Sequence, residues 1–332
     1  MKDVDAITTL PAEYTLENIK SVQKIGKFKN HYVYDIEVEG CHNFFGNDIL
    51  VHNSLYVEFG RLTNFLGIPE EKAVDVVLTL WEKGLQPYIN QKYEEYAKSF
   101  NCPKNLQNLE LEKISGTSIM LAKKMYSMDI RWTEPGIHFK SLEHVIFAGM
   151  EVVRAATPPF CRESIQDFYK SVYEYMTANN NKKPPRELLL KKIKEYKEKY
   201  RYQNPDNIFK CVKMNDYDKF VIDDKNFVRT QPSTPIQVTA AAVGNHMLYK
   251  NNKYMSKYSI LKSGDKVRFY YTKNPMLPVF GYVSGQFPME YALPIDYDLN
   301  FEKMVLNPIN RCVQAIGYSP FPINLCISRA LF

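Results

Sequence analysis

The residues His52-Asn53-Ser54 combine the types that can break a peptide bond. The side-chain amide of Asn53 can attack its own backbone carbonyl, which closes a succinimide ring and releases Ser54 as a free amine. The reaction is slow unless the amide nitrogen is activated and the leaving amine is protonated, and histidine suits both tasks near neutral pH. His52 is adjacent to the bond, and His42 precedes it across an expected turn. We therefore expect the bond after Asn53 to be a cleavage point.

Two further residues extend this chemistry. The hydroxyl of Ser54 is a candidate acceptor for an incoming acyl group. Asp35 could orient a histidine or take part in proton transfer. A single His beside an Asn is most often a surface coincidence, whereas the combination of residues is much rarer. If His42 and His52 act as a proton-transfer pair, cleavage should change in rate between about pH 5.5 and 8, around the reference pKa of histidine.

Short strands are expected to position these residues. Residues 19–28 and 32–37 have strand-like patterns, residues 44–47 read as a turn, and residues 49–51 read as the last strand. Fewer than about 55 residues of short strands form a poor independent core. We therefore expect this segment to complete a β-fold that another chain supplies.

The run VYDIEVEGCHNFFGNDILVHN, which ends at Asn53, resembles the C-terminal end of an intein with its two closing motifs. The resemblance implies splicing without a cofactor. It also gives each candidate residue a role: Asn53 cyclises, His52 and His42 assist, Ser54 carries the branched ester, and Asp35 is the acidic residue of the first closing motif. Cys41 departs from the polar residue common at its position, and we interpret it as structural.

An intein's first nucleophile and its Thr-x-x-His motif belong to an N-terminal segment, and nothing of that kind precedes residue 30. Residues 1–53 therefore resemble the C-terminal fragment of a split intein. Such a fragment splices in trans with a partner chain that carries the N-terminal fragment. A deletion or a truncated sequence would give the same pattern.

The sign of the charge changes at the same boundary. Residues 1–53 contain five Lys and eight Asp or Glu, whereas the whole chain contains 43 Lys or Arg and 37 Asp or Glu. Residues 54–332 therefore have a net charge of +9 against −3 for the first segment. A basic part favours nucleic acid through counterion release, although basic enzymes of other kinds share this property.

The rest of the chain alternates between helical and strand-like patterns. The expected helices cover a stretch that opens at residues 67–71 and is kinked by Gly84 and Pro87, and then residues 162–176, 185–202 and 296–316. The expected strands are 54–58, 109–114, 119–126, 236–242 and 266–271, with a turn at 263–265. The six scattered cysteines indicate reduced thiols, and no secretory signal or membrane-spanning run is present in the sequence.

One strand-like run contains a candidate nucleic-acid contact. Lys123 and Lys124 are adjacent and Tyr126 follows two residues later. Paired lysines beside an aromatic residue suit phosphate contact at a nucleic-acid groove. Paired lysines are also common at the solvated end of an ordinary strand.

A second resemblance covers residues 54–332. SLYVE at 54–58 resembles the continuation of Asp-Thr-Asp-Ser, the metal-binding palm motif of family B DNA polymerases, and LAKKMY at 121–126 is similar to the Lys-Lys-x-Tyr motif that holds the primer–template duplex. EVVRAATP at 151–158 resembles the passage from palm to thumb. LKSGDKVRFYY and FEKMVLNPINRCVQAIGY are similar to the thumb of phage T4-like replicative polymerases.

Together the resemblances imply a precursor with an α+β fold. Residues 1–53 would be a short all-β (Hint-type) intein segment, residues 54–150 the rest of an α/β polymerase palm, and residues 151–332 a mostly helical thumb with a β-rich insertion. The product would be a DNA-directed DNA polymerase, a nucleotidyltransferase that is active only after trans-splicing with an N-terminal polymerase fragment.

The same resemblance implies the partners. The spliced enzyme would bind primer–template DNA and dNTPs, with Mg²⁺ held by carboxylates of the partner fragment and no metal ligand in this chain. The apolar tail 325–332 is a candidate sliding-clamp contact, and the expected location is the cytoplasm of a bacterial host of a phage. The alternative is a stand-alone DNA-binding or accessory protein with an inactive intein relic. A hedgehog-like self-cleaving module is disfavoured because such modules need no terminal Asn.

Overall fold

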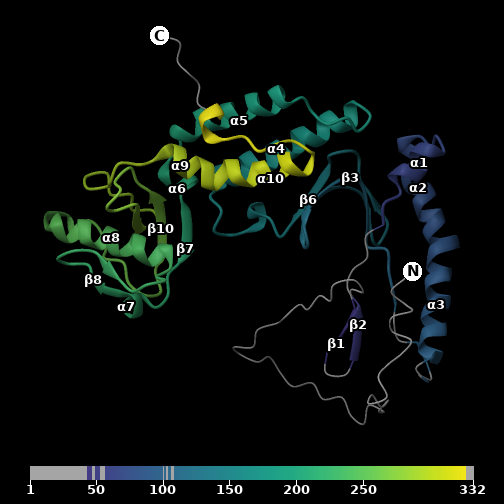
Figure 1. Ribbon diagram of the computed structural model, residues 1–332, viewed down its shortest axis with the longest axis horizontal. Coiled ribbons are helices and arrows are strands. Elements are labelled where there is room, and N and C mark those ends of the chain that lie inside the picture. The colour runs from purple at the N-terminus through teal and green to yellow at the C-terminus, as the bar shows by residue number, and fades with distance from the viewer. Residues whose placement is uncertain are drawn as a thin grey trace. The chain divides into compact units, whose positions relative to one another are not determined.

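The computed structural model divides into two compact units, Met1–Leu111 and Glu112–Phe332, which are described separately below. The residues that it describes are 43–46, 49–52, 57–99, 101, 104–105 and 108–326 (Figure 1). Over these residues the chain is mixed α+β with small antiparallel sheets, which agrees with the predicted class. The domain boundaries expected after residues 53 and 150 stay predictions.

The first unit contains a hairpin close to the expected cleavage point. β1 (Asn43–Gly46) pairs antiparallel with β2 (Ile49–His52), and Asn43 lies opposite His52. The strand expected at 49–51 is confirmed. The turn expected at 44–47 is wrong for its first three residues, which belong to β1, because phenylalanine, found here at positions 44 and 45, favours strands over turns.

Other strands expected in this unit are not reached by the structure. Residues 19–28 and 32–37 lie outside the described residues. Of the strand expected at 54–58, only Val57 and Glu58 are described, and they belong to no strand.

The helices of the first unit follow each other almost without interruption. They are α1 (Gly60–Phe65), α2 (Glu70–Leu80), the π-helical turn η1 (Trp81–Leu85) and α3 (Gln86–Ser99). α2 begins directly after Pro69, as expected. The predicted kink takes the form of η1, because Pro87 has no N–H to donate to the carbonyl of Lys83 and a π turn redistributes the neighbouring bonds.

The second unit begins with a four-stranded antiparallel sheet. Its strands are β3 (Lys113–Ala122), β4 (Met125–Thr133), β5 (Ile137–His138) and β6 (His144–Ala148). β4 is central, with β3 along one edge and both β5 and β6 along the other. The strand expected at 109–114 begins only at Lys113. The strand expected at 119–126 is wrong as a single strand, because residues 123 and 124 form the turn between β3 and β4.

Three long helical segments follow this sheet in the fold (Figure 1). They are α4 (Pro159–Ala178), α5 (Arg186–Arg201) and the run α9 (Tyr297–Phe301), η4 (Glu302–Leu306) and α10 (Asn307–Ala315). Of these, α10 contacts β3 and α5 packs against α4. The helices expected at 162–176, 185–202 and 296–316 are confirmed. Phe147 of β6 packs edge-on against Tyr169 of α4, with ring centroids 5.6 Å apart. The residues that α4 and α10 bury fully in this core include Ile165, Phe168, Tyr169, Val172, Ile309, Cys312 and Val313.

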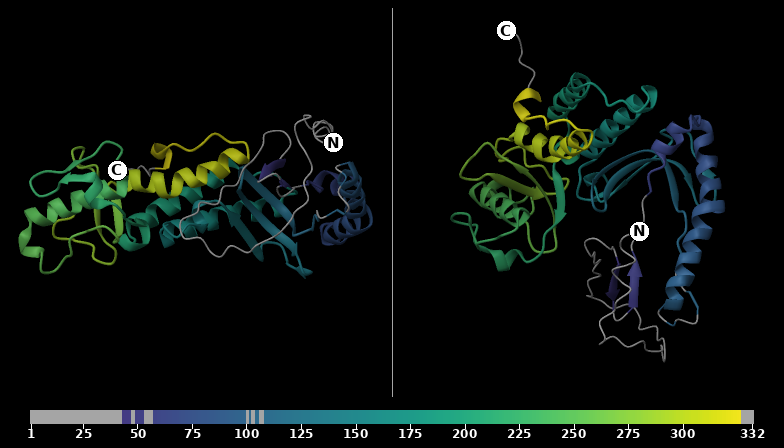
Figure 2. Two further views of the ribbon diagram at one scale, coloured as in Figure 1. Left: turned by 90° about the horizontal axis from the view of Figure 1, so that it is seen from below. Right: turned by 45° about the vertical axis from the view of Figure 1, so that its right-hand side comes forward.

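A smaller module lies between α5 and α9 in the sequence, at the end of the helices away from the β3–β6 sheet (Figures 1 and 2). Its main sheet has the order β11 (Val279–Val283), β10 (Lys266–Tyr271), β7 (Lys210–Lys213) and is antiparallel. α8 (Ile236–Lys250) packs against this sheet. Its remaining elements are α6 (Pro205–Ile208), α7 (Tyr217–Phe220), β8 (Val221–Asp223), β9 (Arg229–Thr230) and the 3-10 turn η3 (Asn252–Tyr254).

The module contains one confirmed strand and one wrong prediction. The strand expected at 266–271 is β10. The strand expected at 236–242 is wrong, because these residues are the first two turns of α8. The β-branched residues at the start of the run favour a strand locally, but Pro235 precedes a run of 15 residues, which is too long for an ordinary strand.

Four cysteines in the described part of the chain are free thiols: Cys161, Cys211, Cys312 and Cys326. Burial raises the pKa of the Cys312 thiol to about 12, so this residue behaves as an apolar core side chain. Across the described residues, no helix has both the length and the apolar character that crossing a bilayer requires.

Candidate nucleic-acid interface

The turn between β3 and β4 presents the two predicted lysines at the tip of a hairpin. Ala122 pairs with Met125, so Lys123 and Lys124 are the only residues of the turn, and both are exposed. Lys124 has a left-handed backbone with φ of 56°. Such a conformation is uncommon for lysine, and a surrounding structure must hold it.

Tyr126 lies just inside the hairpin. It pairs with Met120 of β3 on one side and with Ala148 of β6 on the other. Met125 packs against the core that contains α4 and α10. Since neighbouring residues of a strand point to opposite faces, Tyr126 points to the face away from these two helices. The structure thus brings Lys123, Lys124 and Tyr126 to one end of the sheet.

The residues that directly follow β6 lie against the backbone of the lysine turn. Gly149 has φ of 64°, and a β-carbon added there would come within 2.1 Å of the backbone oxygen of Lys124. Only glycine allows the two backbones to approach this closely. Met150, which is buried, leads from Gly149 into the 3-10 turn η2 (Glu151–Val153).

Two arginines extend the positive charge from this turn to the start of α4. Arg154 donates from Nη2 to the backbone oxygen of Gly149 at 3.2 Å. Arg162 donates from Nη2 to the backbone oxygens of Arg154 and Thr157 at 3.2 and 3.3 Å. These bonds fix the arginine side chains without neutralising them, because a carbonyl oxygen carries no net charge. The arrangement can therefore attract phosphate groups.

The sequence did not indicate either arginine as a nucleic-acid contact. Arg154 lies within the run EVVRAATP at 151–158, which the sequence marks only as a passage between two parts of the chain. Its closeness to the lysine pair depends on the pairing of β4 with β6, which joins residues some 20 positions apart. A local sequence pattern cannot predict that these two segments lie close together.

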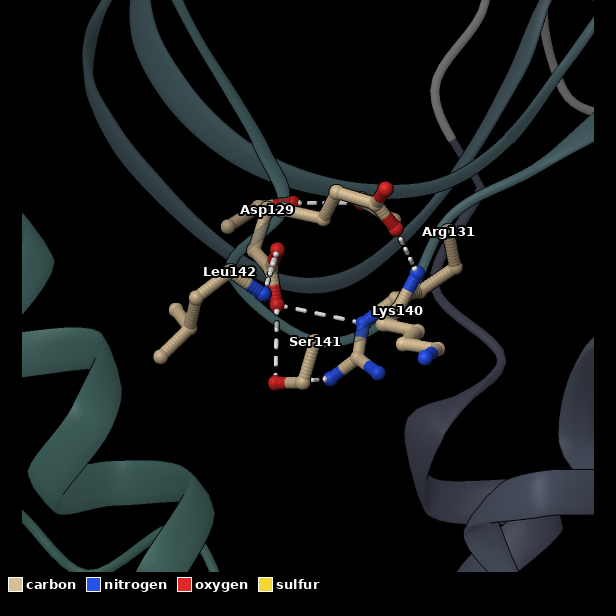
Figure 3. A network of polar contacts seen from close by, with 8 residues as sticks. Asp129, Arg131, Lys140, Ser141 and Leu142 are labelled. Carbon is tan, nitrogen blue, oxygen red and sulfur yellow. Dashed lines mark hydrogen bonds and ion pairs between the residues drawn. The ribbon is translucent and has the colours of Figure 1, made fainter.

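A buried ionic network lies further along the same sheet (Figure 3). Asp129 is fully buried and accepts from Arg131 Nε at 3.1 Å and from the backbone N–H of Leu142 at 2.8 Å. Arg131 also donates from Nη2 to Ser141 Oγ at 2.8 Å. Burial raises the pKa of the Asp129 carboxyl, and the bonds from its neighbours oppose that rise.

The Asp129 network is a structural one. Both carboxylate oxygens are used by partners of the same chain, so the network holds the loop before β6 against β4. Within the described ranges, no three His, Cys, Asp or Glu side chains lie close enough together to hold a metal ion. The expectation that Mg²⁺ ligands come from a partner fragment stays a prediction.

The residues expected to break the peptide bond lie mostly beyond the described part of the chain. Asp35, His42, Asn53 and Ser54 are outside it, whereas the backbone of His52 forms the last position of β2. Of the tail expected to bind a sliding clamp, only Leu325 and Cys326 are described, in the 3-10 turn η5 (Ile323–Cys326). The roles of all these residues stay predictions.

Comparison with known proteins gives one partial similarity. No known family model matches the chain. A DNA polymerase of Thermococcus aggregans is 36% identical over 100 residues, which is 30% of this chain and 4% of that protein. The match thus spans a small fraction of the length of that polymerase. It supports a link between this chain and DNA polymerases.

Proposed function

We propose that this chain is the precursor of the C-terminal half of a replicative DNA polymerase, and that residues 112–332 hold the primer–template duplex. The observation that carries the proposal is the exposed Lys123-Lys124 turn, fixed from beneath by Gly149 and flanked by Arg154. The partial similarity to a DNA polymerase supports the same conclusion.

The chemistry of the turn suits phosphate contact without sequence readout. Lysine side chains are compact positive charges on long stems and reach phosphate oxygens without demanding one geometry. A replicative enzyme has to hold every sequence equally, so contacts of this kind suit its duplex. The dNTPs and the catalytic Mg²⁺ would be bound once the N-terminal fragment adds its carboxylates.

Binding of a primer–template duplex tests the proposal. Lys123→Ala and Lys124→Ala should each weaken binding, and each should reduce the slope of log K against log salt by about 0.9. Lys140→Ala is the matched control, because Lys140 is an exposed lysine in the loop beyond the other end of β4. Unchanged affinity in both turn variants, or an equal loss in the control, would remove the assigned role of the turn.

We also propose that residues 1–53 are removed by trans-splicing with an intein fragment on the partner chain. Asn53 cyclises, His52 and His42 transfer protons, and Ser54 accepts the acyl group. The β1–β2 pairing supports this proposal, because the strand that begins one residue after His42 lies beside the strand that ends one residue before Asn53.

Co-expression with the neighbouring polymerase fragment tests splicing. The expected product is a ligated polypeptide that lacks residues 1–53, seen by mass spectrometry. Asn53→Ala should abolish ligation, whereas Asn47→Ala, six residues earlier, should not. If no ligation occurs and Asn53→Ala changes nothing, the chain is better described as a stand-alone DNA-binding protein with an intein relic.

A further inference from the structure

One arginine of the last long helix contacts both the start of β4 and the turn η2, which follows β6. Arg311 of α10 meets Glu151 of η2 through two contacts, Nη1 to Oε2 at 3.1 Å and Nη2 to Oε1 at 2.8 Å. Its Nη1 also lies 3.6 Å from the sulfur of Met125. A forked arginine–carboxylate pair fixes direction as well as distance. A single guanidinium therefore holds both the first residue of β4 and the segment beneath the turn.

The helix that carries Arg311 is itself firmly held. Ile309, Cys312 and Val313 of α10 are fully buried in the main core. Asn310 exchanges two hydrogen bonds with the backbone of Phe321, which anchors the chain beyond the helix. The position of the guanidinium is thus set by the helical layer and not by the hairpin that it touches.

The other partner, Glu151, is connected to the lysine turn. It follows Gly149 and Met150 directly, and Gly149 lies against the backbone oxygen of Lys124. The backbone oxygen of Glu151 accepts from Thr157 Oγ1 at 2.6 Å, which fixes η2 from its other side. A shift of Glu151 would therefore be transmitted through two residues to the turn.

We propose that Arg311 is a positioning residue for the lysine turn. It acts through Glu151 and Met125 to keep Lys123 and Lys124 where they meet the duplex backbone. The inference rests on the proposed duplex-binding function, but it concerns a different residue and a different mechanism. Glu151 is then required for binding although its charge opposes that of phosphate.

The decisive test is the affinity of the full-length chain for a primer–template duplex after Glu151→Gln. Removing a negative charge beside a basic surface would by electrostatics alone strengthen binding. If Glu151 holds the turn through Arg311, the same variant should instead weaken binding, by about threefold to thirtyfold. Arg311→Gln should weaken it to a similar extent, and adding Lys124→Ala to either variant should cost less than in the wild type.

The outcomes separate this inference from the proposed function. If Lys123→Ala and Lys124→Ala both leave affinity unchanged, the duplex-binding role of the turn itself fails. If Lys124→Ala weakens binding while Glu151→Gln leaves it unchanged or stronger, only the positioning role is overturned. A loss in Arg311→Gln alone, with the salt slope reduced by about 0.9, would make Arg311 a direct phosphate contact and would also overturn it.

Thermal unfolding of each variant checks that a loss of duplex binding does not come from loss of the fold. The pair is partly exposed, and such pairs contribute little to global stability, so the variants should unfold near the wild-type temperature. Glu151→Asp is the second variant, since it keeps the charge but withdraws the carboxylate by one methylene. It should weaken duplex binding in the same direction, and wild-type affinity in this variant would contradict the positioning role.

Discussion

The backbone of Gly149 lies so close to that of Lys124 that a β-carbon on Gly149 would stand 2.1 Å from the Lys124 carbonyl oxygen. Both residues have left-handed backbones, with φ of 64° and 56°. The turn that carries the candidate phosphate-binding lysines is thus held by a backbone contact. An added methyl group on Gly149 would break that contact directly.

Gly149→Ala should therefore displace the turn. The left-handed backbone alone costs about 1–2 kcal/mol for a residue with a β-carbon, and the contact with Lys124 adds to that cost. Chemical denaturation should show a loss of roughly 2–4 kcal/mol, and duplex binding should weaken. Gly67→Ala is the matched control, because Gly67 has φ of 63° and open space around it. Equal losses at the two glycines would contradict the role of the contact.

The Asp129–Arg131 pair should be strongly coupled. Asp129→Ala leaves the largely buried guanidinium without its carboxylate, and Arg131→Ala leaves the buried carboxylate without its cation. Breaking one side of a buried pair costs about 3–5 kcal/mol. The double variant should lose clearly less than the sum of the single losses, as measured by urea denaturation in a double-mutant cycle. Additive losses would show that the pair is not a unit.

Glu290 should make stability depend on pH in the acid range. A hydrogen bond from Lys257 is the largest cause of a lowered pKa at this carboxyl, and a hydrogen bond from Tyr258 is the next. Together with smaller effects they lower the pKa from 4.5 to about 2. Because the pKa is lower in the folded state, the stabilisation is complete above the unfolded value near 4.5 and is lost as pH falls from there to about 2. The difference in unfolding temperature between wild type and Glu290→Gln should shrink over that range.

Glu163→Gln is the control for the pH series, because the Glu163 side chain is exposed and makes no such bonds with the residues that the structure describes. Its unfolding temperature should follow that of the wild type across the same range. A difference between wild type and Glu290→Gln that stays constant from pH 5 to 2 would contradict the assigned bonds.

Gly244→Ala should destabilise the module of α8 and its sheet. In most helices this change stabilises by about 1 kcal/mol. Here a β-carbon would stand 1.9 Å from the backbone oxygen of Gly281 in β11, so helix and strand would have to separate. We expect a loss of about 1–3 kcal/mol in chemical denaturation. Gly84→Ala, where the nearest atom is 3.8 Å away, should be neutral or stabilising.

The sequence predicted the parts of the fold that repeat with a clear period. The apolar face of α4 recurs at helical spacing, so its existence and approximate bounds followed from residues 162–176 alone. The turn between β3 and β4 was missed because both of its positions are lysines, whereas Gly, Asn or Asp usually mark a tight turn. Its left-handed lysine is imposed by the surrounding structure.

Only the part of the candidate interface that is continuous in the sequence could be predicted. Lys123, Lys124 and Tyr126 are neighbours in the sequence and could be recognised there. Arg154 and Arg311 reach the same place through the pairing of β6 and the packing of α10, which no local pattern reports. For the splicing residues, apart from the backbone of His52, the sequence remains the source of the prediction.

The contact between Arg311 and Met125 joins residues that are 186 positions apart. At a synthesis rate of about 5–20 residues per second, the ribosome needs on the order of 10–40 s to travel from one to the other. During that interval β3 and β4 can already pair, but α10 does not yet exist to cover their inner face. The part of the sheet that α10 covers thus stays exposed on the nascent chain for many seconds, which favours chaperone binding at that stage of synthesis.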